Sequence, residues 1–345
     1  MPAADPSVRC PPIVDRPRRQ IVSALAAGSL GPSIVGSALG WAGPVAAQHE
    51  QWPSRPLTLI VPWPAGGPTD ATMRVLARLA ARELGQPVVV ENKPGAGGAI
   101  GVGTMLAAPH DGYTVMQLPI TIYRLPYQQK LNWDPVRDVV PVLQVSEVTF
   151  GIVVTPDSRF RTLADIVAYT RRNPGRLTVG STGIASTPHL VMADLFAREG
   201  TEYIHVPFKG AADQLFALQA STIMVGVVGT GYAPLVDDGR LRLIATFNER
   251  RSERWPTVPT LRELGYDIVT TSPYGIGAPR GVPREIVARL HDAFRIATLD
   301  PEHVAELRRY EQQAAYLDTA AFARLLEQTI ELERRWSRFL PPARS

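Results

Sequence analysis

The stretch from Leu57 to Asp70, LTLIVPWPAGGPTD, predicts a buried strand followed by a tight loop. The apolar run Leu57–Val61 is typical of a strand in a parallel sheet, where both faces are covered. Pro62 and Pro64 end this strand because proline has no N–H to donate to a neighbouring strand. The fold is therefore expected to contain a parallel sheet.

The loop leads directly into a predicted helix. Thr69 and Asp70 are residue types that cap helices, and apolar residues follow at helical spacing as far as Leu84. Free N–H groups at a helix N-terminus, reached through the pair Gly66–Gly67, favour an anion. On this stretch alone, an ordinary connection between a strand and a helix explains the pattern equally well.

A second stretch, Leu177 to Leu190, LTVGSTGIASTPHL, repeats the pattern. A short strand at Leu177–Val179 precedes a loop of serine, threonine and glycine, and Pro188 suits the first turn of the next helix. If each stretch belongs to its own lobe, backbone amides and hydroxyls could hold a small carboxylate between the lobes. Such a site needs neither a nucleophile nor a metal.

Motifs along most of the chain resemble one known family. They read, in order, WPSRPLTLIVPWPAGGPTD (52–70), LGQPVVVENKPGAGGAIG (84–101), DGYTVM (111–116), GSTGIASTPHL (180–190), HVPFKGAAD (205–213), WPTVPTLRELGY (255–266) and YGIGAPRGVP (274–283). The chain resembles periplasmic solute-binding proteins of the tripartite tricarboxylate transporter type, the TctC-like or Bordetella uptake gene (Bug) group. The first two motifs together are specific for this group.

The resemblance implies a fold and a function. The expected fold is α/β, a two-lobed periplasmic binding protein of type II, in which each lobe is a mainly parallel sheet flanked by helices. The expected function is to capture a small organic carboxylate in the cleft and to deliver it to membrane transporter subunits. The resemblance implies no enzymatic activity, cofactor or metal, and the protein is expected to act as a monomer.

The order of apolar runs predicts two crossings between the lobes. A strand at Phe150–Val154 would enter the second lobe, and the chain would return near Ser272–Ala278. One lobe would then contain residues 52–152 and 275–345, and the other residues 153–274.

The family's ligand-binding loops can be carried over residue by residue. In the first loop the resemblance implies contacts from Trp63, Ala65, Gly66 and Thr69. In the second loop it implies contacts from Ser181, Thr182, Gly183 and Ser186. Asp70 is expected to cap the helix near the site rather than touch the ligand, because two carboxylates repel each other.

The chain departs from the family pattern at two places. Ala185 stands where relatives often have glycine, so the second loop is expected to follow a different path and to make the pocket tighter. Relatives also commonly have an acidic residue near Val227, whereas residues 224–232 here read MVGVVGTGY. Without this acid to receive an ammonium group, the ligand is expected to carry a carboxylate but not to need an amine.

The first 47 residues are typical of an export signal. Arg18 and Arg19 precede a weakly apolar segment rich in glycine, and the segment ends in Val45–Ala47, a small-residue cleavage pattern. The twin arginines are compatible with twin-arginine export, and Sec export is the alternative. A transmembrane anchor is disfavoured because glycine and proline interrupt the segment before it reaches the roughly 20 apolar residues that a membrane span needs. The protein is therefore expected in the periplasm, cleaved near Ala47.

Charge and cysteine content agree with an exported solute-binding protein. The formal net charge is +4 over the whole chain, a small surplus that does not indicate binding to nucleic acid. The single cysteine, Cys10, lies in the leader, so the mature chain would contain no thiol.

Two other functions remain open from the sequence. The protein could hand its ligand-bound state to a membrane sensor kinase, with the same fold. It could also be a secreted hydrolase that uses Ser181 and His189, although no G-x-S-x-G, H-E-x-x-H, C-x-x-C or phosphate-binding glycine motif is present.

Overall fold

The computed structural model describes residues 52–336 and 339, with backbone only at residues 271, 332 and 335. These residues belong to one compact unit that begins at Glu50. The predicted leader and its cleavage position near Ala47 lie outside the described residues.

The first of two sheets has six strands in the order β11-β4-β10-β3-β1-β2. The strands are β1 (Leu57–Val61), β2 (Val88–Asn92), β3 (Thr114–Leu118), β4 (Val139–Thr149), β10 (Thr271–Pro279) and β11 (Gln312–Leu317). β1 pairs in parallel with β2 and β3, whereas β10 is antiparallel to both β3 and β4, and β11 is antiparallel to β4. This sheet and its helices form the first lobe.

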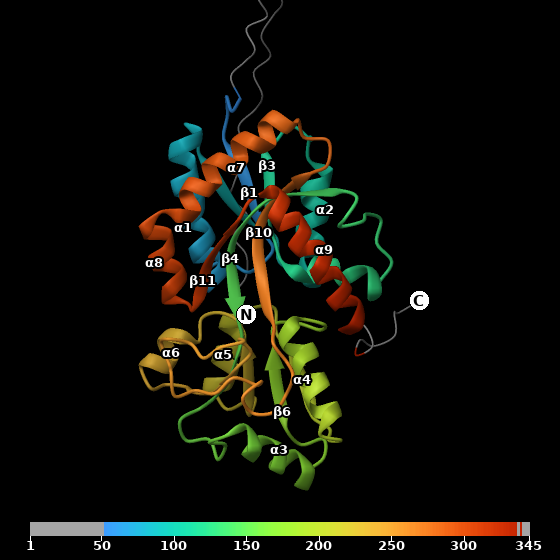
Figure 1. The fold of residues 1–345 in the computed structure, drawn as a ribbon, viewed down its shortest axis with the longest axis vertical. Helices are drawn as coiled ribbons and strands as arrows, with labels where there is room; N and C mark the ends of the chain where they lie inside the picture. Colours follow the sequence, from blue (N-terminus) through green and yellow to red (C-terminus); the bar gives the residue numbers. More distant parts are fainter. Residues whose placement is uncertain (1–51, 337–338, 340–345) are drawn as a thin grey trace, which may run out of the picture. The chain divides into compact units, whose positions relative to one another are not determined.

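Five helices flank the first sheet. They are α1 (Pro68–Leu84), α2 (Ala99–Ala107), α7 (Arg284–Leu299), α8 (Pro301–Arg309) and α9 (Thr319–Trp336), with short 3-10 turns η1 (Ala96–Gly98), η2 (Ile120–Tyr123) and η3 (Leu125–Tyr127). α1 packs against α7 and α8, and α9 packs against β4 and β11 (Figure 1). On α1 the buried face contains Met73, Leu76 and Ala80, whose helical spacing turns them all toward the core.

The second sheet has five strands in the order β7-β6-β8-β5-β9. The strands are β5 (Gly151–Val154), β6 (Thr178–Ser181), β7 (Ile204–Pro207), β8 (Val225–Val228) and β9 (Arg242–Thr246), and the helices are α3 (Leu163–Arg172), α4 (Thr187–Arg198), α5 (Ala211–Gln219) and α6 (Ala233–Asp237). β6 pairs in parallel with β7 and β8, whereas β5 is antiparallel to β8 and β9. This sheet and its helices form the second lobe.

The two-lobed α/β fold is confirmed, but both sheets are mixed and not mainly parallel. In each sheet the antiparallel strands include those next to the crossings, β4, β5 and β10. A parallel strand needs a connection of about a dozen residues to bring the chain back to the same edge. A strand that comes directly from the other sheet has no such connection. Its direction is therefore set by the edge at which the chain enters the sheet.

The two connections between the sheets differ in length. β4 ends at Thr149 and β5 begins at Gly151, so Phe150 alone separates the two sheets at this point. The chain returns through the segment between Thr246 and the start of β10 at residue 271, and β4 and β10 then run side by side (Figure 1). That residues 52–152 with 275–345 and residues 153–274 are the limits of two lobes stays a prediction.

Among the described residues, none of the helices combines the length and the apolar composition that crossing a bilayer requires.

Candidate functional site

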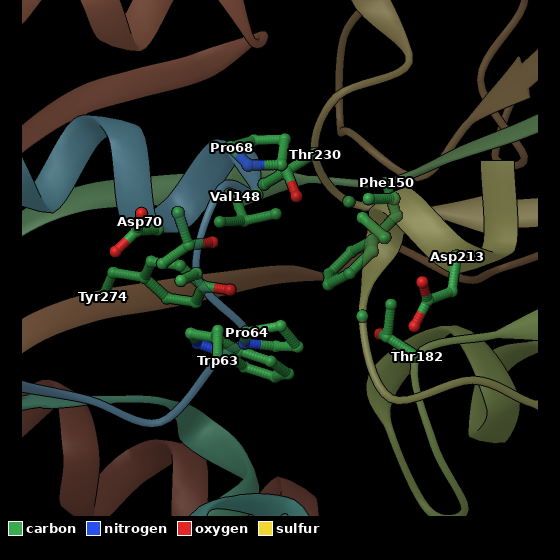
Figure 2. A pocket seen from close by; sticks show the side chains of 17 residues that line it. Trp63, Pro64, Pro68, Asp70, Val148, Phe150, Thr182, Asp213, Thr230 and Tyr274 are labelled. Atoms are coloured by element: carbon green, nitrogen blue, oxygen red, sulfur yellow. The ribbon is translucent and has the colours of Figure 1, made fainter. Parts of the chain in front are cut away.

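A cavity lies where residues that follow strands of both sheets come together. Its volume is about 120 Å³. This is several times the roughly 15 Å³ that one water molecule needs on this measure, so a small organic molecule fits. The lining residues are Trp63, Pro64, Ala65, Gly67, Pro68, Thr69, Asp70, Val148, Phe150, Thr182, Gly210, Ala211, Ala212, Asp213, Gly229, Thr230 and Tyr274. Figure 2 shows Trp63 and Tyr274 on one side of the cavity, and Thr182 and Asp213 on the other.

The N-terminus of α1 forms one wall. The helix begins at Pro68 with Gly67 as its N-cap, two residues before the position that the sequence predicted. Proline is favoured at this first position because its missing N–H would have no partner in the helix. Thr69 and Asp70 are therefore the second and third helical residues, and their N–H groups belong to the first turn, which has no acceptors within the helix.

Asp70 is buried and holds the first loop in place. Its Oδ2 accepts hydrogen bonds from Gly66 N and Arg74 Nε, both at 2.9 Å, and its Oδ1 accepts one from Asn92 Nδ2 at 2.8 Å. The prediction that Asp70 is the helix cap is wrong, because Gly67 occupies that position, but the carboxylate does bind a backbone N–H upstream of the helix. Burial raises the Asp70 pKa, and the hydrogen bonds from Arg74, Gly66 and Asn92 lower it by more, so that its pKa lies below the ordinary value.

Gly66 is close to the cavity but does not line it. Its N–H is bound to Asp70, and its φ of 78° lies in the left-handed region that favours glycine. Its role in ligand binding stays a prediction, whereas its role in shaping the loop is visible.

Trp63 and Thr69 are fixed by neighbours in the first sheet. The Trp63 indole donates a hydrogen bond of 3.0 Å to Gln117 Oε1 from β3. Thr69 forms a side-chain hydrogen bond with Tyr274, whose pKa is raised to about 12, chiefly by burial. Both Trp63 and Thr69 line the cavity, as does the predicted contact Ala65.

The N-terminus of α5 forms the opposite wall, and the sequence analysis missed it. Gly210 is its N-cap, and Ala211, Ala212 and Asp213 make its first turn. The signal was present in HVPFKGAAD (205–213), because β7 runs through a glycine into a helix, just as β1 does before α1. The stretch has no serine or threonine, so its loop lacks the hydroxyl groups that mark the loop before α4. Two helix N-termini thus face one cavity, an arrangement that favours an anion.

Of the predicted second loop, only Thr182 lines the cavity. Ser181 and Ser186 are buried and bind within the loop itself. Both serine hydroxyls donate to Gly183 O, at 3.1 and 2.9 Å, and their oxygens are 3.2 Å apart. Ligand contacts from Ser181, Gly183 and Ser186 stay predictions. The two serine hydroxyls donate to Gly183 O, and these hydrogen bonds shape the loop.

Two stacked histidines lie behind this loop. The rings of His189 and His205 are 3.8 Å apart between centroids and 14° from parallel. Burial lowers the pKa of both, to about 4 for His189, with a further contribution from Arg124, and to about 3 for His205, with a further contribution from His189. Both rings are therefore neutral at physiological pH.

The histidine pair does not match the hydrolase alternative. Ser181 Oγ shares a 2.7 Å hydrogen bond with His205 Nε2, not with His189, which instead accepts from Ala185 N through Nδ1 at 2.9 Å. Neither Ser181 nor a histidine lines the cavity. The predicted pairing of Ser181 with His189 is therefore not seen, because Ser181 Oγ is bound to His205 and His189 Nδ1 is bound to Ala185 N.

A buried arginine of the first lobe supports the second loop. Arg124 is 1% exposed and forms an ion pair with Glu333 of α9, which is 3% exposed. The same guanidinium donates to Ala185 O at 3.1 Å and to Thr187 Oγ1 at 2.7 Å. Arg124 thus connects α9 to the loop that carries Thr182.

The crossing between the sheets forms the remaining wall. Val148 and Phe150 line the cavity together with Gly229 and Thr230, which follow β8. A methyl group on Gly229 would lie 2.6 Å from Val148 Cγ1 and 2.7 Å from the Phe150 ring, so only glycine fits between β8 and the crossing.

The two lobes touch at the rim of the cavity. A methyl group added to Gly210 would lie 3.2 Å from Pro64 Cγ, and one added to Gly231 would lie 2.7 Å from Pro68 Cγ. Pro64 lies in the first loop and Pro68 is the first residue of α1, whereas both glycines belong to the second lobe. Residues of the two lobes therefore approach each other closely at this rim.

Within residues 52–336, no three side chains of histidine, cysteine, aspartate or glutamate are grouped so that they could bind a metal ion.

Known proteins resemble this chain in sequence and fold. The model of the tripartite tricarboxylate transporter family receptors (TctC) matches residues 72–339. A curated protein from Cupriavidus necator, described by its place in the gbd 5' region, is 42% identical over 86% of this chain and 91% of its own length. BugT from Bordetella pertussis is 32% identical over 73% of this chain and 78% of its own length.

Two solved structures share the fold. An R. palustris protein with adipate has a TM-score of 0.79 at 28% identity, covering 84% of this chain and 98% of that one. MatC from Rhodopseudomonas palustris, with bound malate, has a TM-score of 0.76 at 25% identity, covering 84% and 100%. The family model spans most of the chain, and the relatives match most of its length. The chain therefore belongs to the tripartite tricarboxylate transporter receptor family, the TctC-like or Bug solute-binding proteins.

Proposed function

We propose that this protein is a periplasmic receptor that captures a small organic carboxylate for uptake by a tripartite tricarboxylate-type transporter. The observation that carries the proposal is that the N-termini of α1 and α5 face one cavity. Adipate and malate, bound by two structural neighbours, are carboxylates of suitable size. The protein would act without catalysis or a cofactor, as a monomer.

The proposed binding step is closure of two lobes over the ligand. Residues 52–152 with 275–345 would form one lobe and residues 153–274 the other, moving about Phe150 and the return segment before β10. Ligand would shift the equilibrium toward the closed form, which the membrane subunits would recognise.

Calorimetry on a carboxylic acid and its neutral amide tests the anion site directly. Hydrogen bonds to a charged group contribute about 1.5 to 3 kcal/mol each, so the amide should bind at least tenfold more weakly. Thr69→Val and Thr182→Val should each weaken binding of the acid by about tenfold. The matched control Thr222→Val changes a threonine of the second lobe that does not line the cavity, and it should leave affinity unchanged. Equal affinity for acid and amide would contradict the proposal.

Export is proposed to depend on residues 1–47. The mature periplasmic protein should begin near Gln48, which N-terminal sequencing or mass spectrometry would establish. Replacing Arg18 and Arg19 with lysine should block export if the twin-arginine route is used, and should have little effect on Sec export.

A further inference from the structure

The cavity contains acidic side chains but no basic one. Among its lining residues, all within the described part of the chain, Asp70 and Asp213 are acidic, and none is lysine, arginine or histidine. Lys209 precedes the α5 N-cap but is exposed and does not line the cavity. An anion here is therefore held by helix N-termini and hydroxyl groups alone.

The two acids are in different situations. Asp70 is bound by Arg74, Asn92 and Gly66, so its charge is already compensated. Asp213 is exposed at the third position of α5, and none of the described residues forms a hydrogen bond or an ion pair with its carboxylate. It points its oxygens toward the cavity opposite Trp63 and Tyr274 (Figure 2).

This charge pattern discriminates between acids. One ligand carboxylate gains from the helix N-termini, but a second one near Asp213 meets a like charge with no cation to offset it. An ammonium group in the same place meets an opposite charge, and the aromatic rings of Trp63, Phe150 and Tyr274 also attract cations. The sequence analysis looked for an acid only at the strand end near Val227 and did not consider the first turn of α5, where Asp213 lines the cavity.

We propose that the cavity takes a zwitterionic monocarboxylate whose ammonium group is bound by Asp213, in preference to a dicarboxylate. This inference rests on the proposed function, since it assigns the ligand class of the same site. Asp213 is a specificity-determining residue in this assignment, while Thr69, Thr182 and the two helix N-termini bind the carboxylate.

Two sets of acids of equal length provide the test. Calorimetry would compare 6-aminohexanoate, hexanoate and adipate, and then 4-aminobutyrate, butyrate and succinate, on the purified protein. In at least one set, the amino acid should bind at least tenfold more tightly than the dicarboxylate, and the neutral-tailed acid should lie between them. Asp213→Asn should remove most of this difference, and Asp213→Lys should reverse it in favour of the dicarboxylate.

Asp165→Asn is the matched control. Asp165 is also the third residue of a second-lobe helix, α3, but it lies outside the cavity lining, so the order of affinities should not change. Tightest binding of the dicarboxylates, unaltered by Asp213→Asn, would overturn the ligand class and leave the carboxylate receptor intact. Failure of all six acids to bind would overturn both.

Discussion

Asp70 shows how one residue keeps a helix N-terminus ready for an anion. Its buried carboxylate accepts from Gly66, Arg74 and Asn92, and so ties the loop, the helix and β2 together. Because the loop amide of Gly66 is bound to Asp70, the carboxylate determines which N–H groups remain for a ligand. Asp70 therefore shapes the site without being expected to touch the ligand.

Asp70→Asn should lower the free energy of unfolding by about 1.5 to 3 kcal/mol, because an amide cannot accept from all three donors and leaves Arg74 without its charge partner. Urea denaturation would measure the change. Asp165→Asn, at the same position of α3 but only half-buried, should cost about 1 kcal/mol or less. Equal losses in the two variants would contradict the special role of Asp70.

Single residues of the site were predictable where a residue next to a strand end also faces the cavity. The family resemblance implied contacts from Trp63, Ala65, Thr69 and Thr182, and all four line the cavity. The contacts of Ser181 and Ser186 stay predictions, and the bond between Ser181 Oγ and His205 could not be foreseen, since His205 is distant in sequence and only folding brings it within 2.7 Å. Hydroxyl content alone does not distinguish a serine that faces a ligand from one that closes its own loop.

At the scale of elements, α9 is connected to the second lobe through Arg124, which pairs with Glu333 of α9 and donates hydrogen bonds to the second lobe. Arg124 lies between Glu333 of α9 and the loop at Ala185 and Thr187. The guanidinium carbon of Arg124 also lies over the ring of Trp336, 5.6 Å from the ring centroid. The position of the loop that carries Thr182 therefore depends on the last helix of the first lobe.

Arg124→Met should destabilise the protein by about 3 to 5 kcal/mol, because Glu333 is left buried without a partner. Combining it with Glu333→Leu should recover most of this loss, since replacing both partners of a buried pair is often neutral. Thermal or urea unfolding of the single and double variants gives the coupling. As a control, Arg137→Met breaks an exposed pair with Asp138 and should change stability by less than about 1 kcal/mol.

Elements were predictable where apolar spacing and capping agree. In α3, Thr162 and Asp165 form a capping box at the start of a helix whose buried apolar residues recur at helical spacing, a pattern visible in the sequence. β7 was missed because its four residues are mostly half-buried or exposed, and such a short edge strand has little apolar signal. The antiparallel direction of β4, β5 and β10 was also missed, because strand direction depends on connections between sheets and not on the composition of the strand.

For the whole molecule, the stacked histidines predict loss of stability in acid. Burial holds the pKa of His189 at about 4, against 6.5 for the free side chain, so the unfolded chain takes up a proton that the folded chain excludes. Stability from this group is complete above pH 6.5 and decreases as the pH falls toward 4, by up to about 3 kcal/mol. His205 adds to the decrease in the same direction, reduced by solvent screening.

Denaturation measured from pH 7 to pH 4 checks this prediction. His189→Asn with His205→Gln keeps acceptors near Ala185 N and Ser181 Oγ but removes both titrating groups. The variant should therefore lose less stability in acid than the original protein. Burial also lowers the pKa of His303. This residue is present in both proteins, so its contribution to the pH dependence cancels in the comparison. Identical pH profiles would show that the pair titrates normally.

Closure of the lobes can be tested with a single methyl group. Gly231→Ala should hold the lobes apart, because the added carbon lies 2.7 Å from Pro68 Cγ. Ligand affinity should fall at least tenfold, and small-angle scattering with saturating ligand should give a larger radius of gyration than for the original protein. Gly239→Ala is the control, since Gly239 has a similar positive φ with nothing within 4 Å. It should show only the strain of roughly 1 to 2 kcal/mol that both variants share.

Phe150 is the only residue between β4 and β5, and it also forms part of the cavity wall. A descendant of this protein that changed Phe150 to accept a bulkier ligand would also change the single residue that connects the two sheets at this point. Adaptation to new ligands is therefore easier at Asp213 or Thr230, which line the cavity away from this connection. Diversification of ligand range in close relatives should thus concentrate at the helix starts and strand ends, while the crossing residue changes slowly.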